Sequence, residues 1–393
     1  MSLPGKVPSI DSSFWSGVLR VSKCVSVTLF AMRLLLSARW DQSLAAVREA
    51  VSRHLPRFLG YYPPLTPPQL APTSQKPSAE NCLPPPVAAT FKLRAAHLFD
   101  AGPQPWRTEP WARPQIPSMI CPDEIDFLHY LARTQYRNRG SIIEFGPLGG
   151  VSTCALALGA PEAILHAYDF WIYHDSLRDY FPGRYLRLGQ SVLPAFLENI
   201  RPFRDRVRVH RGDLTRQRWA SGPIEIVFVD AAKTPASLLH MFREFFPWVV
   251  PQGWIVWQDY VSATCPWIHL ALEELADYFE YWDSPEGGTV VTRLKCPLPR
   301  EPLPADYFGT LRLERARAHL ARARDRFPGW ETLDIWLAEA LWLALAGCAA
   351  ESRNILQAIP QDSRFSQGSF DYDLKFIAHW IEAASAGKPF TAV

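Results

Sequence analysis

Short apolar runs alternate with amphipathic helical patterns through the middle of the chain. Five runs have the length and composition of buried strands, and the stretches between them place apolar residues at helical spacing. The predicted strands are Ser141–Phe145, Ala163–Tyr168, Val207–His210, Ile224–Val229 and Trp254–Trp257. The predicted helices are Asp123–Arg137, Ser152–Leu158, Ser191–Ile200, Pro235–Phe246 and Pro266–Tyr278. This alternation predicts an α/β fold with a parallel, Rossmann-like sheet covered by helices on both faces.

The regions on either side of this pattern differ from it. Residues 1–60 form a basic amphipathic helical segment by their spacing, and residues 61–116 are a proline-rich linker by composition. We expect the α/β domain at 117–296 and an all-α region at 297–393. Helices in that last region are predicted at Leu311–Arg324, Trp330–Ala346, Ala350–Ala358 and Asp371–Ala384.

Two roles stay open for each flanking region. The basic helices are expected to pack on the main domain, with contact to a protein or a membrane surface as the alternative. The C-terminal region is interpreted as a helical cap, with protein interaction as the alternative. A homo-oligomer is also an open alternative.

Composition narrows the class of protein. The chain has 393 residues, of which 48% are hydrophobic, and a formal net charge of +2, so it can build a large core and lacks the concentrated basic charge of a nucleic-acid-binding protein. Its seven cysteines are scattered with no CxxC pair, which is typical of the reducing cytoplasm. The longest apolar run, Val25–Leu36, is shorter than the roughly 20 residues of a membrane-spanning helix. We therefore expect a cytoplasmic protein with no transmembrane segment.

The strongest motif joins the first predicted strand to the next helix. Residues 141 to 153 read Ser-Ile-Ile-Glu-Phe-Gly-Pro-Leu-Gly-Gly-Val-Ser-Thr, so the strand ends in Glu144 and a glycine-containing turn follows. Gly146 and Gly150 would let a ligand approach the backbone, and the start of the helix offers unpaired N–H groups. The motif is not a P-loop, because no Gly-Lys-Ser/Thr follows.

Further acids follow the second and third strands. Asp169 lies at the end of the second strand, where an acid can accept the ribose hydroxyls of a nucleoside cofactor. Asp213 follows the third strand, where an acid commonly meets the adenine. For each acid taken alone, a loop residue or a helix cap is the alternative. Three acids at successive strand ends favour a nucleotide-binding edge.

These motifs resemble the class I S-adenosylmethionine (SAM) methyltransferases, in the branch of macrocin-type and catechol-type O-methyltransferases. Tyr-Asp-Phe-Trp at 168–171, Phe-Val-Asp-Ala-Ala-Lys at 228–233 and Gly-Trp-Ile-Val-Trp-Gln-Asp-Tyr at 253–260 match its later motifs in order and spacing. The resemblance covers about 150 residues and implies a seven-stranded sheet whose antiparallel last strand is Gly288–Leu294. The cofactor residues it implies are Glu144, Gly146, Gly149, Gly150, Ser152, Asp169, Phe170, Asp213 and Asp230.

The resemblance also implies how an acceptor hydroxyl would be activated. In the catechol-type family, acids at two strand ends hold a divalent metal, and a lysine three residues after the first acid is the base. Asp230, Asp259 and Lys233 match those positions, while Gln258 stands where a third ligand, usually an acid, would be. Mg²⁺ is therefore an open expectation. Lys233 would need a lowered pKa to act, and a surface lysine is its alternative role.

A histidine follows the last motif. His269 is a candidate base for the acceptor, with a structural role as the alternative, and His174 is a weaker candidate. The leading hypothesis is SAM-dependent O-methylation of a small-molecule hydroxyl on a sugar or natural product. The alternatives are a cephalosporin-hydroxylase-like enzyme, which the same branch contains, and a non-catalytic SAM- or nucleotide-binding module acting through its helical extensions.

Overall fold

A computed structural model of the chain describes residues 111–174, 186–283, 288–327 and 331–359, with positions 106 and 177 and parts of 374–382. The chain divides into two units, residues 1–63 and 64–393, and every described residue belongs to the second. The predicted basic segment 1–60 and most of the predicted linker 61–116 lie outside the described residues.

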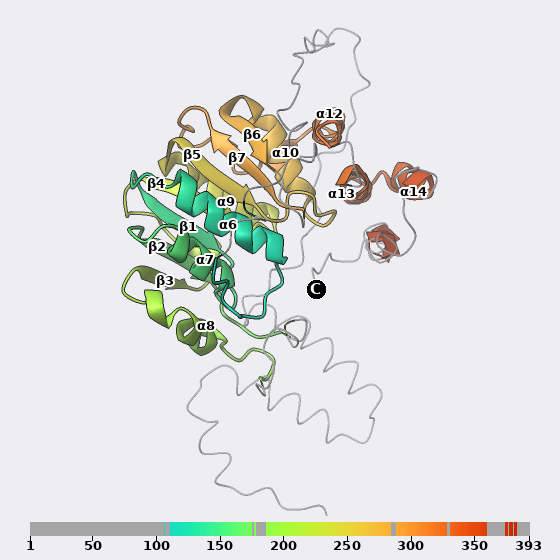
Figure 1. The fold of residues 1–393 in the computed structure, drawn as a ribbon. Coiled ribbons are helices and arrows are strands. Elements are labelled where there is room, and N and C mark those ends of the chain that lie inside the picture. The colour runs from blue at the N-terminus through green and yellow to red at the C-terminus, as the bar shows by residue number, and fades with distance from the viewer. Residues whose placement is uncertain are drawn as a thin grey trace, which may run out of the picture. The chain divides into compact units, whose positions relative to one another are not determined.

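The described part of the chain is built on one seven-stranded sheet with the order β3-β2-β1-β4-β5-β7-β6 (Figure 1). The strands are β1 (Ser141–Phe145), β2 (Leu165–Asp169), β3 (Val207–Arg211), β4 (Ile224–Val229), β5 (Val249–Trp257), β6 (Phe279–Asp283) and β7 (Val290–Leu294). β1 to β5 pair in parallel, and β7 is antiparallel to both of its neighbours. The predicted Rossmann-like fold with an antiparallel last strand is confirmed.

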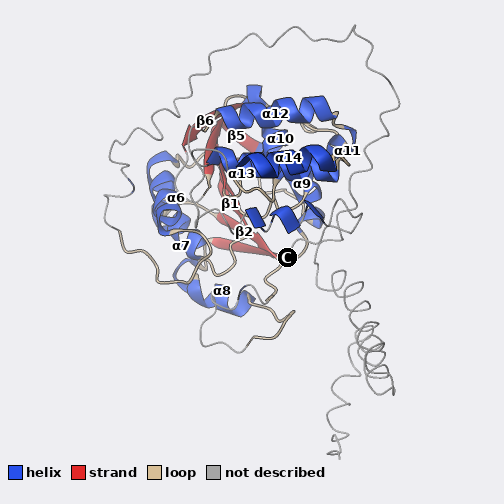
Figure 2. Ribbon diagram, turned by 90° about the vertical axis from the view of Figure 1, so that its right-hand side faces the viewer, coloured by secondary structure: helices blue, strands red, loops and turns tan. Residues whose placement is uncertain are grey.

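Helices cover both faces of this sheet (Figure 2). One face carries α6 (Pro122–Gln135), α7 (Val151–Gly159) and α8 (Leu193–Asn199). The other carries α9 (Pro235–Glu244), α10 (Pro266–Glu274) and α12 (Leu313–Asp325). The remaining described helices of the C-terminal region are α11 (Tyr307–Thr310), α13 (Glu331–Leu345) and α14 (Ala349–Ala358).

Alternation along the strands divides the core into two layers. Ile142 of β1 packs with α6 and α7, whereas Ile143 and Phe145, which are two residues apart, face the layer of α9 and α10. All six residues of β4 are buried, because a central strand of a doubly covered sheet meets side chains on both faces. The short apolar runs of the sequence correspond to these central strands.

The region after β5 differs from the prediction. The helix expected at Pro266–Tyr278 ends at Glu274, a 3-10 turn follows at Ala276–Tyr278, and β6 begins at Phe279. The residues of β6 form an edge strand because they pair with β7, from Phe279 opposite Leu294 onward. This strand was not predicted, since its pairing partner lies further along the chain.

The segment before α6 packs against that helix rather than away from the domain. Trp111 Nε1 donates to Asp126 Oδ1 at 2.7 Å, and Arg113 Nε donates to the same oxygen at 2.9 Å. The indole of Trp111 stacks on His129 with ring centroids 4.2 Å apart. The described end of the predicted linker therefore belongs to the packed domain.

The C-terminal helices share a core with the sheet domain. Ala316 and Leu320 of α12 lie in the same apolar cluster as α10 and the strands. Arginines of α12 also pair with glutamates of three neighbouring helices: Arg315 with Glu274, Arg322 with Glu273, Arg324 with Glu339 and Arg317 with Glu351. Of the predicted helix 371–384, only seven residues are described, and they are helical. Within the described residues, no helix is long and apolar enough to cross a membrane.

Candidate functional site

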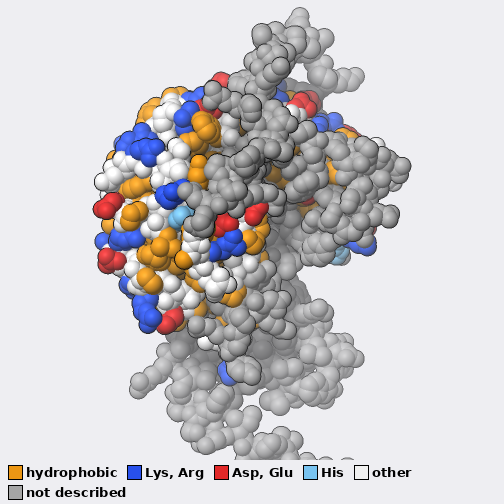
Figure 3. Space-filling view, viewed as in Figure 1, with side chains coloured by type: hydrophobic (Ala, Val, Ile, Leu, Met, Phe, Trp, Pro, Cys, Tyr) orange, Lys and Arg blue, Asp and Glu red, His pale blue; other side chains and the backbone are white. Residues whose placement is uncertain are grey.

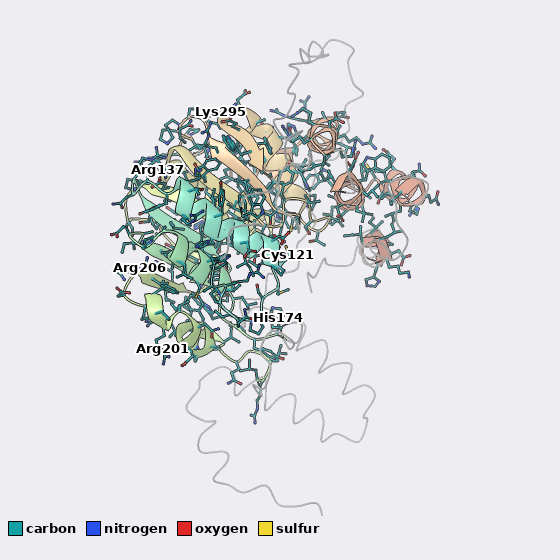
Figure 4. The ribbon with its side chains drawn as sticks, in the orientation of Figure 1. Cys121, Arg137, His174, Arg201, Arg206 and Lys295 are labelled. Atoms are coloured by element: carbon teal, nitrogen blue, oxygen red, sulfur yellow. The ribbon has the colours of Figure 1, made fainter. Side chains whose placement is uncertain are left out.

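The candidate site lies at the carboxyl edge of the parallel strands. Figure 4 labels Cys121, just before α6, and His174, after β2, on this side of the sheet, with Arg137 and Arg206 on the opposite side. Loops that follow β1, β2, β4 and β5 converge here because parallel strands end at the same edge. Most of the predicted site residues lie on these loops or at the strand ends that precede them.

The glycine turn after β1 lies directly on the end of β4. Gly146 has a φ of +89°, and a Cβ built there would be 2.6 Å from the carbonyl oxygen of Asp230. Gly150, with a φ of +91°, precedes α7 and gives that helix no side-chain cap. The first N–H groups of α7 therefore have no side-chain partner at the cap and face the turn, as a cofactor cradle requires.

Glu144, near the end of β1, connects this turn to the first residues of α7 through hydrogen bonds. Its buried carboxylate accepts hydrogen bonds from the hydroxyls of Ser152 and Thr153. Burial raises the pKa of Glu144 to about 7, while the two hydroxyls lower it. Glu144 and Ser152, both predicted to bind cofactor, are thus joined to each other and shape the turn.

Asp169 connects the turn after β1 to the loop after β2. Its carboxylate accepts the backbone N–H of Leu148 at 3.1 Å and that of Trp171 at 2.7 Å. Leu148 and Trp171 have φ values of +43° and +49°, an unfavourable backbone region for bulky residues. Burial raises the pKa of Asp169, and these N–H groups lower it. Asp169 therefore holds two strained loops at the predicted ribose position.

The other predicted cofactor residues lie around this pair of loops. The carbonyl of Gly149 accepts Asn199 Nδ2 at 2.9 Å, and Phe170 is half-buried. Asp213 accepts the backbone N–H of Thr215 at 2.9 Å, so its side chain caps the 3-10 turn after β3. The helix-cap alternative is what this carboxylate does here, and contact with adenine stays a prediction.

A lysine and two acids form a cluster at the ends of β4 and β5. Lys233 Nζ donates to Asp230 Oδ1 at 3.0 Å and also to Asp259 Oδ2. The amide of Gln258 lies against both acids; with its nitrogen turned to them, it donates to Asp230 Oδ1 at 3.0 Å and to Asp259 Oδ1 at 2.9 Å. The candidate catalytic and metal residues are thus brought together, His269 excepted.

The charge of this cluster changes the role expected for Lys233. Burial by itself lowers the pKa of Lys233, but Asp230 and Asp259 together raise it well above its usual value. The pKa of Asp230 is raised by burial and by Asp259, against the opposing effect of Lys233. Lys233 is therefore an ammonium hydrogen-bond donor, and the expected base with a lowered pKa is not what this geometry produces.

His269 lies in the core of the domain. The residue is on α10, is fully buried and packs edge-on against Tyr260 with ring centroids 5.0 Å apart. Burial lowers the pKa of His269 to about 3. This placement corresponds to the structural alternative for His269 and does not support its predicted role as the base.

A further acid near the cluster comes from α6 and was not predicted. Glu124 is buried and accepts the backbone N–H of Cys121 at 2.8 Å and the hydroxyl of Thr289. Burial raises the pKa of Glu124, and the charge of Asp259 raises it further. Glu124 lies three residues after the N-cap Cys121, a spacing typical of a capping box, so nothing in the sequence indicated its place near the cluster.

The acidic cluster does not fit a divalent metal as it stands. The ammonium of Lys233 lies between the carboxylates of Asp230 and Asp259, and the Gln258 amide can donate to both. No group of three His, Cys, Asp or Glu side chains in the described ranges is arranged to hold a metal ion. The expected use of Mg²⁺ therefore finds no site in this arrangement.

Comparison with known proteins agrees with the geometry. Residues 143–260, from β1 to the residue after Asp259, match the family model described as a methyltransferase domain. With the seven-stranded sheet, this match confirms, over these residues, the resemblance to class I SAM-dependent methyltransferases that the sequence predicts. No curated protein matches the chain.

Solved methyltransferases cover less than half of the chain. The O-methyltransferase NovP is 16% identical, with a TM-score of 0.36 over 46% of this chain and 82% of its own. Cofactor-bound Rv0187 from MTB is 20% identical, with a TM-score of 0.32 over 46% and 84%. The SAH-bound methyltransferase PaMTH1 of Podospora anserina is 17% identical, with a TM-score of 0.31 over 44% and 77%. At these scores, the likeness carries no argument about the acceptor.

Proposed function

We propose that this chain transfers the methyl group of SAM to a hydroxyl of a small molecule. The observation that carries the proposal is the contact between the two halves of the site. Gly146 of the cofactor turn packs on the carbonyl of Asp230, whose side chain begins the cluster with Lys233 and Asp259. Methyl transfer needs a donor and an acceptor held in line at about 3 Å, and a cofactor turn that lies directly against the Lys233 cluster supports such an arrangement.

The cofactor half is formed by the turn after β1, the start of α7 and Asp169. SAM, when bound, supplies a methyl group on a positively charged sulfur. Asp169 has a lone pair left on each oxygen after accepting one backbone N–H, so it can also accept the hydroxyls of a ribose. The glycines at 146 and 150 let this turn pack closely on the carbonyl of Asp230 and on the side chains of Phe196 and Ile200, which fixes its shape.

The acceptor half is formed by Lys233 and its two acids. An ammonium has three N–H donors, and two of those on Lys233 are used by Asp230 and Asp259. The third can donate to an acceptor oxygen and hold it in place, since the Lys233 side chain is 40% exposed. The hydroxyl proton can pass to Asp230, because its raised pKa makes it a better proton acceptor than an ordinary carboxylate.

Calorimetric titration with SAM and with S-adenosylhomocysteine tests the cofactor half. Asp169→Ala should weaken binding about ten- to a hundredfold, because it removes a charged acceptor of hydrogen bonds. Asp205→Ala is the matched control, since this exposed aspartate precedes β3 at the opposite edge of the sheet. If wild type fails to bind either ligand, the proposed function is wrong.

Transfer of a radiolabelled methyl group to a panel of sugars and phenols tests the acceptor half. We expect Lys233→Met to lose transfer by more than about tenfold while SAM affinity is retained, because the lost donor lies on the acceptor side. Binding of SAM without transfer to any hydroxyl, amine or thiol would favour the non-catalytic module instead. Equal transfer by wild type and Lys233→Met would show that the cluster does not serve the reaction.

A further inference from the structure

The acidic cluster has a side chain cation at its centre. Lys233 bonds one oxygen of Asp230 and one of Asp259, which come from the ends of two neighbouring strands. The other oxygen of Asp259 lies 2.9 Å from the Gln258 amide nitrogen when that nitrogen faces it. N–H donors of the chain itself thus contact three of the four carboxylate oxygens of the two acids.

The exposure of the three side chains shows which of them faces outward. Asp259 is 14% exposed and Asp230 is 21% exposed, whereas Lys233 is 40% exposed. Lys233 is therefore the most exposed of the three side chains, and its ammonium lies against one oxygen of each acid. Divalent cations such as Mg²⁺ need oxygen lone pairs directed at them, and here N–H groups are directed at three of the four carboxylate oxygens.

We infer that Lys233 is a built-in cation that takes the place of a divalent metal between Asp230 and Asp259. The inference rests on the proposed function for its chemical role, since the ammonium would then orient the acceptor oxygen in place of a metal. Its occupancy of the cation position, however, is a property of the cluster alone. The site would consequently show no requirement for added divalent ions.

Removing the lysine should convert the cluster into a metal site. Lys233→Ala leaves two carboxylates side by side without a counter-charge, and the Gln258 amide can turn its oxygen toward them. Two carboxylates and an amide oxygen are the hard ligands that Mg²⁺ and Mn²⁺ prefer. Lys233→Arg, by contrast, keeps a cation between the acids and should bind divalent metal no more tightly than wild type does.

Titration of the full-length protein with Mn²⁺, followed by the loss of the free-ion paramagnetic resonance signal, tests this inference. We expect Lys233→Ala to bind one Mn²⁺ at least about tenfold more tightly than wild type or Lys233→Arg. The double variant Lys233→Ala, Asp259→Asn should lose this gain, because one carboxylate is then neutral. If circular dichroism shows that Lys233→Ala does not fold, Lys233→Met is a second variant that removes the ammonium from between the acids.

Two results would overturn the inference. In the first, wild type binds Mn²⁺ as tightly as Lys233→Ala and loses that affinity in Asp259→Asn, which would mean that the lysine does not exclude a metal. In the second, neither Lys233→Ala nor Lys233→Met gains affinity for Mn²⁺, which would mean that the acids do not form a cation position. SAM titration of the same samples separates these outcomes from failure of the proposed function, because Mn²⁺ binding does not depend on the cofactor.

Discussion

Glu144 makes the stability of this protein depend on pH in a specific window. The carboxyl group is 1% exposed, and burial raises its pKa from 4.5 to about 7 even though two hydroxyls donate to it. Between those pH values, the folded protein keeps a proton that the unfolded chain has lost. Folding must therefore bind a proton there, so the contribution of Glu144 to stability falls as pH rises.

The size of the effect follows from the shift. One pKa unit corresponds to about 1.4 kcal/mol, so the change from pH 5 to pH 8 is roughly 2 to 3 kcal/mol. Glu144→Gln keeps the shape and an acceptor oxygen for the hydroxyls but cannot titrate. Relative to wild type, the variant should therefore become more stable by that amount as pH is raised from 5 to 8.

Urea denaturation followed by tryptophan fluorescence at pH 5 and pH 8 measures this difference. Glu198→Gln is the control, since that glutamate on α8 is 64% exposed and its variant should follow wild type at both pH values. The reasoning is refuted if the stability of Glu144→Gln relative to wild type is the same at pH 5 and pH 8, or is lower at pH 8. In that case the buried carboxyl would not be protonated in the folded state near neutral pH.

Two further predictions concern the cofactor turn and the C-terminal helices. In urea denaturation, Gly146→Ala should lower the free energy of unfolding by more than about 2 kcal/mol, because its methyl group would lie 2.6 Å from a backbone oxygen at a left-handed position. The same variant should weaken SAM binding. Gly309→Ala is the control and should be nearly neutral, because a methyl group there would have nothing within 4 Å. Glu273→Ala should cost roughly 3 to 5 kcal/mol in urea denaturation, since it leaves Arg326, 13% exposed, without its carboxylate. Glu351→Ala, at 47% exposure, should cost less than about 1 kcal/mol, and equal losses for the two variants would contradict this account of α12.

The charge distribution on the surface agrees with the nearly equal numbers of basic and acidic residues in the chain. On the face that Figure 3 shows, basic and acidic side chains are interspersed among apolar ones. Several arginines of α12, abundant in the sequence, are paired with glutamates of neighbouring helices. Their role is therefore to join helices, which the sequence pattern could not distinguish from a solvated basic surface.

The sequence by itself determined the parallel strands of the sheet and the glycine turn after β1. Apolar runs such as Ile224–Val229 form central strands because burial on both faces leaves no polar position, and that signal is local. The glycine turn is local as well, since Gly146 and Gly150 take left-handed backbone conformations that the motif itself indicates. A few consecutive residues were enough for these predictions.

Only the tertiary structure decided the chemistry of the acceptor side. The pKa of Lys233 depends on Asp259, which lies 26 residues further along the chain, and Glu124 enters the same area from α6. β6 likewise needs β7 beside it to be a strand. Electrostatic interaction and strand pairing depend on distance in space, so the sequence supplied the candidate groups and the fold set their charge and their partners.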